Sequence, residues 1–566
     1  MKLPFSIQHL FLGSLLLASL ATAYGQTWRT VSGTNWSTAA NWGGVLPSQD
    51  GTADLVFSAV GDPSLTRGDT TLDADWNVRS LFWNSTALDS GNAYIRGSST
   101  LSLQNGLTNA SGGHVTISPN IVVPTAQVWN DNSLTSNNSG PGTTVIGVIS
   151  GNGSITKTGN GSLYLKSAVN TYTGGTTLSE GKLVISGDQS LGSGTLTWAG
   201  GFLDGELGKG ARTISNNVSL LYGRVGGNEA LTFTGAVDLG GASNRVIRGQ
   251  TAVTTFTNTI SNGGLNLQDG NFAFQGMNTY TGGLVLTDSG KAIVANDANL
   301  GGASNELTFI RGTLSTTSTF STARSMTFRP EDGGTIDTAA DTTLTVTGTV
   351  QGPAGIYGTM TKKGAGTLVF SGADKMLNSM SVIDGALLLD NTGSTAGPYT
   401  YSRVYSGATF GGTGSVGTLY VFTGSHFAPG GEYGDVMNVN GYLQLAGGSN
   451  IDFALGVTSS DQIQLADSPW NRFSGAPDTS ILVNISDAGG LNIGQSYTLI
   501  DGSSAAATDL DASDFYLNSS PIDGTFSVVN NSLVFTTVPE PSSLLFALAG
   551  LCPFLLLLRK RLSPSA

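Results

Sequence analysis

Short runs in which apolar and polar residues alternate, separated by glycine turns, are the feature that most limits how this chain can fold. In residues 151–186 (GNGSITKTGNGSLYLKSAVNTYTGGTTLSEGKLVIS), Leu163 and Leu165 alternate with Ser162 and Tyr164. A period of two places successive side chains on opposite faces of a β-strand, so each run predicts a strand with one buried face. The glycine pairs between the runs predict turns.

The same segments return further along the chain. Residues 170–175 (NTYTGG) recur as residues 278–283, and residues 156–161 (TKTGNG) recur as residues 361–366 (TKKGAG). Self-similarity of this kind, with short strands and glycine turns, predicts a solenoid. Each coil of a solenoid has an apolar face that only a neighbouring coil can bury, so the coils must stack.

These segments resemble the autotransporter-associated beta-strand repeat, in which a Lys-x-Gly run is followed by Asn-Thr-Tyr and a glycine pair. The clearest copies are residues 151–186, 261–294 and 358–389. The second copy lacks the Lys-x-Gly and the third lacks the Asn-Thr-Tyr. The resemblance implies a right-handed parallel β-helix, so we expect an all-β solenoid with a C-terminal β-rich region and a single hydrophobic helix at the C-terminus.

Composition narrows the possible functions. Charged residues make up 11% of the chain and the net charge is −13, whereas nucleic-acid binding needs a positive surface, so we expect no nucleic-acid partner. The single cysteine, Cys552, lies in the apolar tail, which excludes an intramolecular disulfide and a cysteine metal site.

The N-terminus reads as a secretory signal peptide. Lys2 precedes an apolar stretch at residues 11–20, and Ala21 and Ala23 give the small-x-small pattern of a cleavage site. We expect cleavage after Ala23 and export of the remaining chain.

The C-terminus reads as a short membrane segment. Residues 544–558 contain no charged side chain. As a helix they reach about 22 Å, less than the ~30 Å hydrocarbon core, but their leucines favour insertion. Arg559, Lys560 and Arg561 follow and are expected to stay cytoplasmic. The body of the chain then lies outside, as the signal peptide also requires.

The tail resembles the PEP-CTERM sorting signal, since Val538, Pro539, Glu540 and Pro541 precede the apolar segment and the basic residues. The resemblance implies recognition by an exosortase-type transpeptidase and a bacterium that makes exopolysaccharide. The alternative is a plain C-terminal anchor. The expected organisation is a signal peptide (1–23), a Trp-rich N-terminal cap (24–50), a β-solenoid (51–445), a C-terminal β-region (446–537), and a sorting signal (538–566) with its transmembrane segment (544–558).

Residues suited to catalysis are sparse. The chain has no G-x-S-x-G, H-E-x-x-H or P-loop motif, and His114 and His426 lie in strand-like runs where outward side chains are expected. We predict no catalytic residue and no required cofactor. Asp509, Asp511 and Asp514 are weak candidates for Ca²⁺, because carboxylates are its preferred ligands; solvated turn residues explain them equally well.

Aromatic residues offer one further possibility. If Tyr164, Tyr172, Trp198 and Tyr280 face outward, they can stack on sugars; otherwise they are ordinary strand residues packed on their neighbours.

We therefore expect an exported structural or adhesive β-solenoid at the cell surface or in the extracellular matrix. It is anchored in the inner membrane by its C-terminus or processed there by an exosortase, and extracellular polysaccharide is its expected partner. The alternative is a carbohydrate-binding or polysaccharide-degrading β-helix enzyme, which requires acids and bases to converge on one groove. A bare Thr, Asn and Ser surface favours the structural role. We do not expect a self-secreting autotransporter passenger, because the chain closes on a helix-type apolar run.

Overall fold

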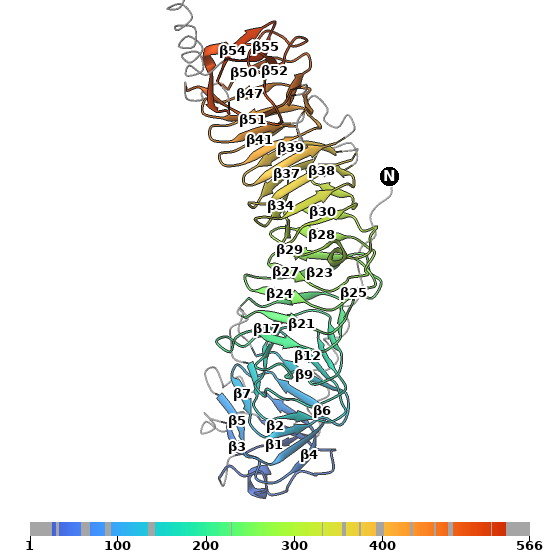
Figure 1. Cartoon of the computed structure of the whole chain (residues 1–566). Helices are drawn as coiled ribbons and strands as arrows, with labels where there is room; N and C mark the ends of the chain where they lie inside the picture. Colours follow the sequence, from blue (N-terminus) through green and yellow to red (C-terminus); the bar gives the residue numbers. More distant parts are fainter. Residues whose placement is uncertain are drawn as a thin grey trace, which may run out of the picture. The chain divides into compact units, whose positions relative to one another are not determined.

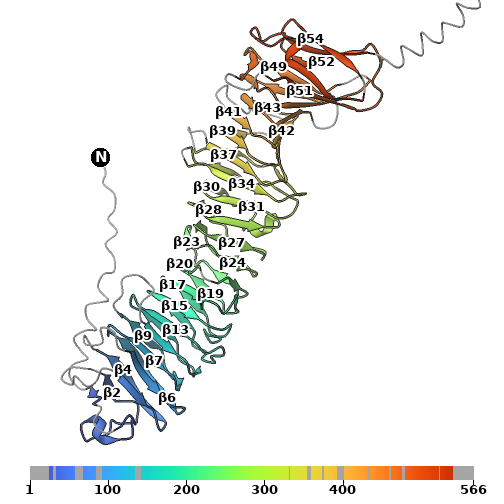
Figure 2. The same ribbon diagram turned by 90° about the vertical axis from the view of Figure 1, so that its left-hand side faces the viewer.

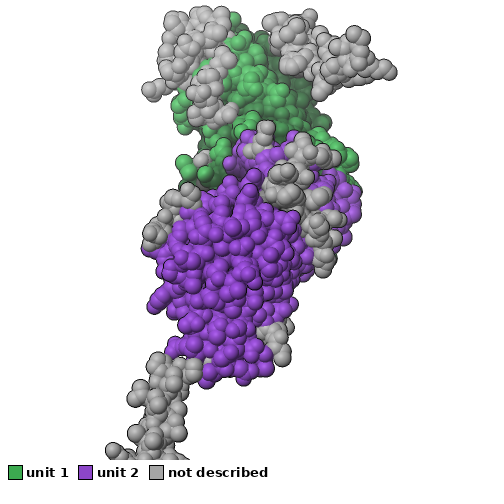
Figure 3. Space-filling model, turned by 90° about the horizontal axis from the view of Figure 1, so that it is seen from above, with its two compact units in different colours: residues 1–265, 270–280 green, residues 266–269, 281–566 purple. Residues whose placement is uncertain are grey.

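The computed structural model describes residues 25–29, 33–57, 68–84, 92–133, 142–227, 229–330, 332–353, 358–372, 375–391, 401–430, 434–457, 460–473, 479–521 and 523–538. The chain divides into two compact units (Figure 3). Unit 1 comprises residues 1–265 and 270–280, and unit 2 comprises residues 266–269 and 281–566.

Unit 1 is built from parallel strands that stack coil upon coil (Figure 1). Its thirteen-stranded sheet contains β1 (Gln26–Thr27), β2 (Asp54–Phe57), β4 (Trp76–Trp83), β6 (Thr100–Asn109), β9 (Gln127–Asp131), β12 (Ile155–Thr158), β14 (Thr176–Leu178), β16 (Leu196–Trp198), β19 (Val218–Leu220), β22 (Val237–Asp238) and β25 (Ile260–Ser261), with β8 (Asn120–Val122) and β11 (Ile149–Ser150) beside this path.

A second row of parallel strands in unit 1 runs through β3 (Gly68–Thr71), β5 (Asn92–Arg96), β7 (His114–Ile117), β10 (Gly142–Val145), β13 (Ser162–Leu165), β15 (Lys182–Ile185), β17 (Phe202–Gly205), β20 (Gly223–Val225) and β23 (Arg245–Arg248). A third row contains β18 (Arg212–Ile214), β21 (Leu231–Phe233), β24 (Val253–Phe256) and β27 (Asn271–Phe274). The strand β26 (Leu265–Gln268) begins in unit 1 and continues into unit 2.

The parallel register explains the core. Leu163 pairs with Leu183, which pairs with Leu203, so like residues lie above one another in successive coils. All three side chains are at most 1% exposed. Each fully buried leucine contributes roughly 1.5–3 kcal/mol relative to an exposed one, and this burial exists only when the coils stack.

Aromatic rings stack in the same way. In unit 1, Trp198, Phe233, Phe256 and Phe274 form a column with successive centroid distances of 5.9, 5.1 and 5.7 Å. In the Trp-rich region at the start of the chain, the rings of Trp28 and Trp42 pack edge to face at 4.9 Å. The aromatic column and the tryptophan cluster both place large apolar side chains in the interior of unit 1.

Unit 2 repeats the parallel arrangement (Figure 2). One row contains β28 (Leu284–Thr287), β30 (Leu307–Ile310), β33 (Met326–Phe328) and β36 (Val350–Gln351). Another contains β29 (Lys291–Val294), β31 (Thr313–Thr316), β34 (Gly334–Thr338), β37 (Gly358–Lys363), β39 (Lys375–Val382), β41 (Tyr401–Val404), β44 (Thr418–Val421), β47 (Leu443–Leu445) and β50 (Trp470–Arg472).

Two further sheets complete unit 2. The nine-stranded sheet contains β32 (Phe320–Thr322), β35 (Thr343–Val346), β38 (Thr367–Ser371), β40 (Ala386–Asp390), β42 (Thr409–Gly412), β45 (His426–Pro429), β48 (Asn450–Leu455), β51 (Ile481–Asp487) and β53 (Phe515–Ser519). The six-stranded sheet contains β43 (Ser415–Val416), β46 (Val436–Val439), β49 (Gln462–Leu465), β52 (Ser496–Asp501), β55 (Ser532–Thr537) and β54 (Gly524–Val529).

Parallel pairing continues past residue 445, where the sequence predicted the solenoid to end. Strand β48 pairs in parallel with β45 and β51, and β51 pairs in parallel with β53. Antiparallel strand pairing appears only at β52, β55 and β54 among the described strands. The glycine rhythm is lost before the stacking is, since β51 and β53 continue the coil with no glycine pair directly before them.

Helices contribute little to the described parts of the chain, which contain the short 3-10 helices η1 (Ala39–Trp42), η2 (Asp297–Leu300) and η3 (Ala512–Asp514). No helix among these residues is long and apolar enough to span a bilayer. The predicted hydrophobic helix at residues 544–558 lies outside the described residues. The prediction of an all-β parallel solenoid is confirmed, whereas its right-handed sense stays a prediction.

Candidate functional site: repeat clamps and the outward strand faces

The lysine of the first repeat copy is buried and binds turn carbonyls. The Lys157 side chain points inward from β12, and Lys157 pairs in register with Trp129 and Leu178 of the neighbouring strands. Its ammonium donates hydrogen bonds to the carbonyl oxygens of Thr158 at 2.7 Å, Gly159 at 2.7 Å and Glu180 at 3.3 Å. The ammonium thereby ties the turn of its own coil to the turn of the next.

The lysine of the third copy makes the same contacts. Lys362 lies in β37, between Ile336 and Val382 in register. Its ammonium donates to the carbonyl oxygens of Lys363 at 2.8 Å, Gly364 at 2.6 Å and Asp384 at 3.1 Å. We call each of these arrangements a lysine clamp.

Burial sets the electrostatics of both clamps. Both lysine side chains belong to residues that are 0% exposed. Burial lowers the pKa of Lys157 to about 8, while the charges of Asp131 and Glu180 act in the opposite direction. Burial likewise lowers the pKa of Lys362 to about 8 against the charges of Asp384 and Asp337. The clamps are sealed inside the coil, which suits a structural role.

A glycine in the next coil makes room for the first clamp. Gly181 has φ +66°, and a Cβ there would lie 2.3 Å from the carbonyl oxygens of both Gly159 and Gly161. It would also lie 2.7 Å from the Lys157 ammonium nitrogen. The repeat therefore needs glycine where the turns of two coils touch.

The Asn-Thr-Tyr segment joins three coils. Asn170 accepts a hydrogen bond from the Ile149 backbone N–H at 2.8 Å and donates to the Ser190 carbonyl at 2.7 Å. The Tyr172 hydroxyl lies 2.5 Å from the Thr176 hydroxyl. In the second copy, Asn278 accepts from the Ile260 N–H at 2.8 Å. These polar side chains satisfy buried backbone groups and hold the coil spacing.

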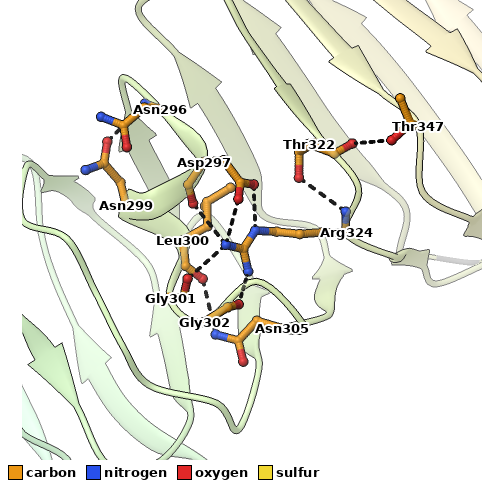
Figure 4. A network of polar contacts seen from close by, with 10 residues as sticks. All are labelled: Asn296, Asp297, Asn299, Leu300, Gly301, Gly302, Asn305, Thr322, Arg324 and Thr347. Atoms are coloured by element: carbon orange, nitrogen blue, oxygen red, sulfur yellow. Dashed lines mark hydrogen bonds and ion pairs between the residues drawn. The ribbon is translucent and has the colours of Figure 1, made fainter.

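An arginine that the sequence did not single out fastens the coil after the second copy (Figure 4). Arg324 is 2% exposed, and its guanidinium contacts the Asp297 carboxylate at 2.7 and 3.0 Å. It also donates to the carbonyl oxygens of Gly301, at 2.8 Å, and Gly302. The backbone there needs a buried donor, and arginine supplies several in a fixed geometry.

Three of the four aromatic residues considered for sugar stacking are buried, so for them the alternative of ordinary packing on neighbouring residues holds. Tyr172 and Tyr280 are 0% exposed and Trp198 is 1% exposed. Tyr172 and Tyr280 lie in turn segments where alternation no longer tells inside from outside. Burial also raises the pKa of the Tyr172 hydroxyl. Tyr164 is half-buried on the outward face of β13, with the Lys166 ammonium 5.5 Å from its ring centre.

The outward face of unit 2 carries a row of small hydroxyl side chains. Thr313 pairs in register with Thr335, Thr335 with Thr361, and Thr361 with Ser381. The chain offers here the Thr and Ser surface expected of a structural solenoid.

The two strand histidines are engaged differently. The His114 ring accepts a hydrogen bond from the Gly142 N–H at 3.2 Å and lies 2.9 Å from the Thr144 hydroxyl. Burial lowers the pKa of His114. His426 lies 2.8 Å from Asp452, whose other oxygen accepts from Asn484 at 2.6 Å. Each histidine joins side chains of neighbouring coils.

The weak Ca²⁺ candidates serve as caps and ion-pair partners. Asp511 accepts from the Ser513 N–H at 2.7 Å and caps η3. Asp514 forms an ion pair with Arg472, and Asp509 accepts from the Arg472 N–H at 3.0 Å. Across the described ranges, no group of three or more His, Cys, Asp or Glu residues is arranged to hold a metal ion.

The predicted processing residues lie mostly outside the described residues. These are Ala21, Ala23, Pro539, Glu540, Pro541, Arg559, Lys560 and Arg561. Val538 is described, and its backbone N–H donates to the Asp523 carbonyl at 2.8 Å.

Comparison with known proteins identifies the repeats. The family model described as passenger-associated-transport-repeat matches residues 155–185 and 360–380. The adhesin BmaC autotransporter of Brucella suis biovar 1 (strain 1330) is 30% identical over 175 residues, covering 27% of this chain and 5% of that protein. The chain thus spans only a small part of this relative. It carries passenger-associated-transport-repeats at two places, and each contains one of the clamp lysines.

Proposed function

We propose that this protein is an exported β-solenoid of the cell surface with an adhesive or matrix-forming role. The observation that carries the proposal is the passenger-associated-transport-repeat at residues 155–185 and 360–380, seated in stacked parallel coils. The similarity to a protein named as an adhesin points the same way. Stacked coils suit such a role because they present long, repetitive outward faces.

The use of charged groups favours a structural role over catalysis. The carboxylates of Asp337 and Glu206 pair with Lys291 and Lys166, respectively. Those of Asp288 and Asp332 both pair with Arg311. These acids and bases neutralise one another along the strands, which is an arrangement expected of a stable scaffold.

The route to the surface is a further part of the proposal. A signal peptide ending at Ala23 starts export, and the apolar segment at residues 544–558 holds the chain in the inner membrane. Arg559, Lys560 and Arg561 remain cytoplasmic. An exosortase-type transpeptidase then recognises Val538, Pro539, Glu540 and Pro541. Extracellular polysaccharide is the proposed partner of the released or tethered protein.

Two measurements test this function. Intact cells carrying the full chain with a surface-loop epitope should bind antibody and lose the epitope to external protease. Cells lacking the protein should attach less to abiotic surfaces or to one another. An epitope protected in intact cells, or attachment unchanged on deletion, would contradict the proposal.

Mass spectrometry of the mature C-terminus tests the sorting step separately. We expect a terminus near residue 541, and retention of residues 544–566 in a Glu540→Ala variant. A wild-type protein that keeps its whole tail acts as a plain anchor, and the exosortase part of the proposal then fails.

A further inference from the structure

A cluster of partly exposed aromatic rings surrounds an arginine on the outward side of unit 2. We call it the aromatic patch, and it consists of Tyr401, Arg403, Tyr405, Tyr420, Phe422 and Phe473. Tyr401 is 38% exposed and Tyr405 is 37% exposed. The patch belongs to β41, β44 and the residues that directly follow β41, β44 and β50.

Strand alternation builds this patch. In β41, Ser402 and Val404 point inward and are 0% exposed, which leaves Tyr401 and Arg403 facing outward. In β44, Leu419 and Val421 are likewise 0% exposed, so Tyr420 faces outward. The parallel register sets Arg403 directly beside Tyr420.

The rings form a continuous platform. Tyr401 and Tyr420 are stacked with centroids 6.3 Å apart, and Tyr405 lies 5.2 Å from Phe422. Phe473 meets Tyr420 edge to face at 5.8 Å and Phe422 at 5.1 Å. Because each ring is held by its neighbours, little side-chain freedom remains to be lost on binding.

Arg403 differs from Arg96, another arginine that lies over a tyrosine ring. Its guanidinium lies 6.0 Å from the Tyr401 ring centre and 5.6 Å from that of Tyr420, and its hydrogen bond goes to the Ser379 hydroxyl at 3.3 Å. Arg96, which lies 4.4 Å from the Tyr94 ring centre, pairs with Asp69 at 3.3 Å. Among the described side chains, Arg403 has no carboxylate partner, so most of its fork of donors is free to meet an anion.

We infer that the aromatic patch binds an acidic polysaccharide. The C–H faces of pyranose rings are apolar and carry slight positive charge, so they stack on the negative faces of aromatic rings. A sugar carboxylate can then take a bidentate contact from the guanidinium. This inference rests on the proposed function, because it names the class of molecule that a surface protein of this kind would hold.

Charge favours this occupant over a second copy of the chain. Arg403 is the one charged residue among the outward side chains of β41, β44 and β47, which otherwise present two tyrosines and a glutamine. Tyrosine hydroxyls at the rim suit the hydroxyl groups of a sugar. The chain as a whole carries −13, but exposed charges more than about 8 Å away are screened at physiological salt.

Binding of the purified full chain to polygalacturonate, with neutral dextran as the comparison, tests the inference. Affinity is measured by calorimetry at physiological salt. We expect Arg403→Gln to weaken binding to polygalacturonate about tenfold, as for a lost charge-assisted hydrogen bond. Tyr420→Ala should weaken it roughly three- to tenfold. Arg403→Lys keeps the charge but loses the planar guanidinium. Its affinity for polygalacturonate should lie between that of Arg403→Gln and that of the wild type.

Arg96→Gln is the matched control, because it removes an arginine stacked on a tyrosine outside the patch. It should bind like the wild type, and circular dichroism should show every variant folded. The inference is overturned by a wild type that does not bind polygalacturonate, by full binding in Arg403→Gln, or by equal loss in Arg96→Gln. A wild-type dimer that Tyr420→Ala dissociates would also overturn it, in favour of a second copy. If cells carrying Arg403→Gln still attach as the wild type does, the proposed adhesive function holds but does not depend on the aromatic patch.

Discussion

Lys157 in unit 1 and Lys362 in unit 2 donate to corresponding carbonyls: that of the next residue, that of the glycine after it, and that of an acidic residue in the following coil. The acidic residue is Glu180 for the first lysine and Asp384 for the second. The recurring Lys-x-Gly of the sequence is thus a buried cross-link between turns. An ammonium suits this place because its three N–H donors match the three carbonyl oxygens that converge there.

Replacing the clamp lysine by methionine is expected to destabilise the protein. Lys362→Met keeps the apolar stem but leaves three turn carbonyls without their donor, and we expect a loss of about 3 kcal/mol in the free energy of unfolding. Urea denaturation of the full chain measures it. Lys363→Met is the control, because Lys363 is exposed and its carbonyl remains in place; it should change stability by less than about 0.5 kcal/mol. Equal stability of the two variants would contradict the clamp.

The clamp also predicts a dependence of stability on pH. An unfolded lysine holds its proton up to a pKa of about 10.4, whereas burial lowers the folded pKa of Lys362 to about 8. Between these values the unfolded state binds more protons, so the free energy of unfolding due to this group rises with pH, by up to about 3 kcal/mol.

The measurement compares urea denaturation of the wild type and Lys362→Met from pH 7 to pH 10. The free energy of unfolding of the wild type minus that of Lys362→Met should rise from pH 7 to pH 10. The contributions of all other titrating groups are the same in both proteins and cancel in this difference. Lys363→Met should follow the wild type. Parallel pH profiles for the wild type and Lys362→Met would show that the buried lysine does not titrate in this window.

The sequence was sufficient to predict the coil but not the clamps. Alternation in runs such as Leu163 and Leu165 is read directly as an inward face, and the parallel stacking agrees. The burial of Lys157 was not predicted, since lysine is among the residues least often buried. Its partners, the carbonyls of Gly159 and Glu180, come from two coils and meet only after stacking.

The aromatic residues show where alternation works and where it fails. Residues 170–175 form no strand, so period two gave no reliable orientation for Tyr172. Leu196 and Trp198 lie two residues apart in one strand, so alternation alone should have placed Trp198 on the inward face with Leu196. The same pattern in Tyr401, Arg403 and Tyr405 would have revealed the outward patch. Arg324 carried no such signal, because its carbonyl partners lie in the preceding coil.

Glycine at the clamp turn is expected to be required for packing as well as for its backbone angle. In Gly181→Ala, the new Cβ lies 2.3 Å from two carbonyl oxygens, so the turn must move in addition to adopting a positive φ. We expect a loss of at least 3 kcal/mol, roughly, in the free energy of unfolding. Gly208→Ala is the control, because Gly208 has φ +77° but open space around the added atom; it should lose only about 1 kcal/mol. Similar losses, measured by urea denaturation, would mean that the backbone angle alone explains the glycine.

Arg324 is expected to be as sensitive to substitution as Lys362, the clamp lysine of unit 2. Arg324→Met leaves the carbonyls of Gly301 and Gly302 and the carboxylate of Asp297 without their donor, so we expect a loss of about 3 kcal/mol. Arg324→Lys should recover only part of it, because an ammonium cannot reproduce the planar fork that reaches all three.

Amide hydrogen exchange measures the effect locally. The backbone N–H groups of residues 297–302 should exchange faster in both Arg324 variants than in the wild type. Arg329→Met serves as the control, because Arg329 is exposed and lies in the same coil region. Protection in that control should equal the wild type. If Arg324→Lys is as stable and as protected as the wild type, a single point charge suffices and the bidentate contact to Asp297 is not what fixes the turn.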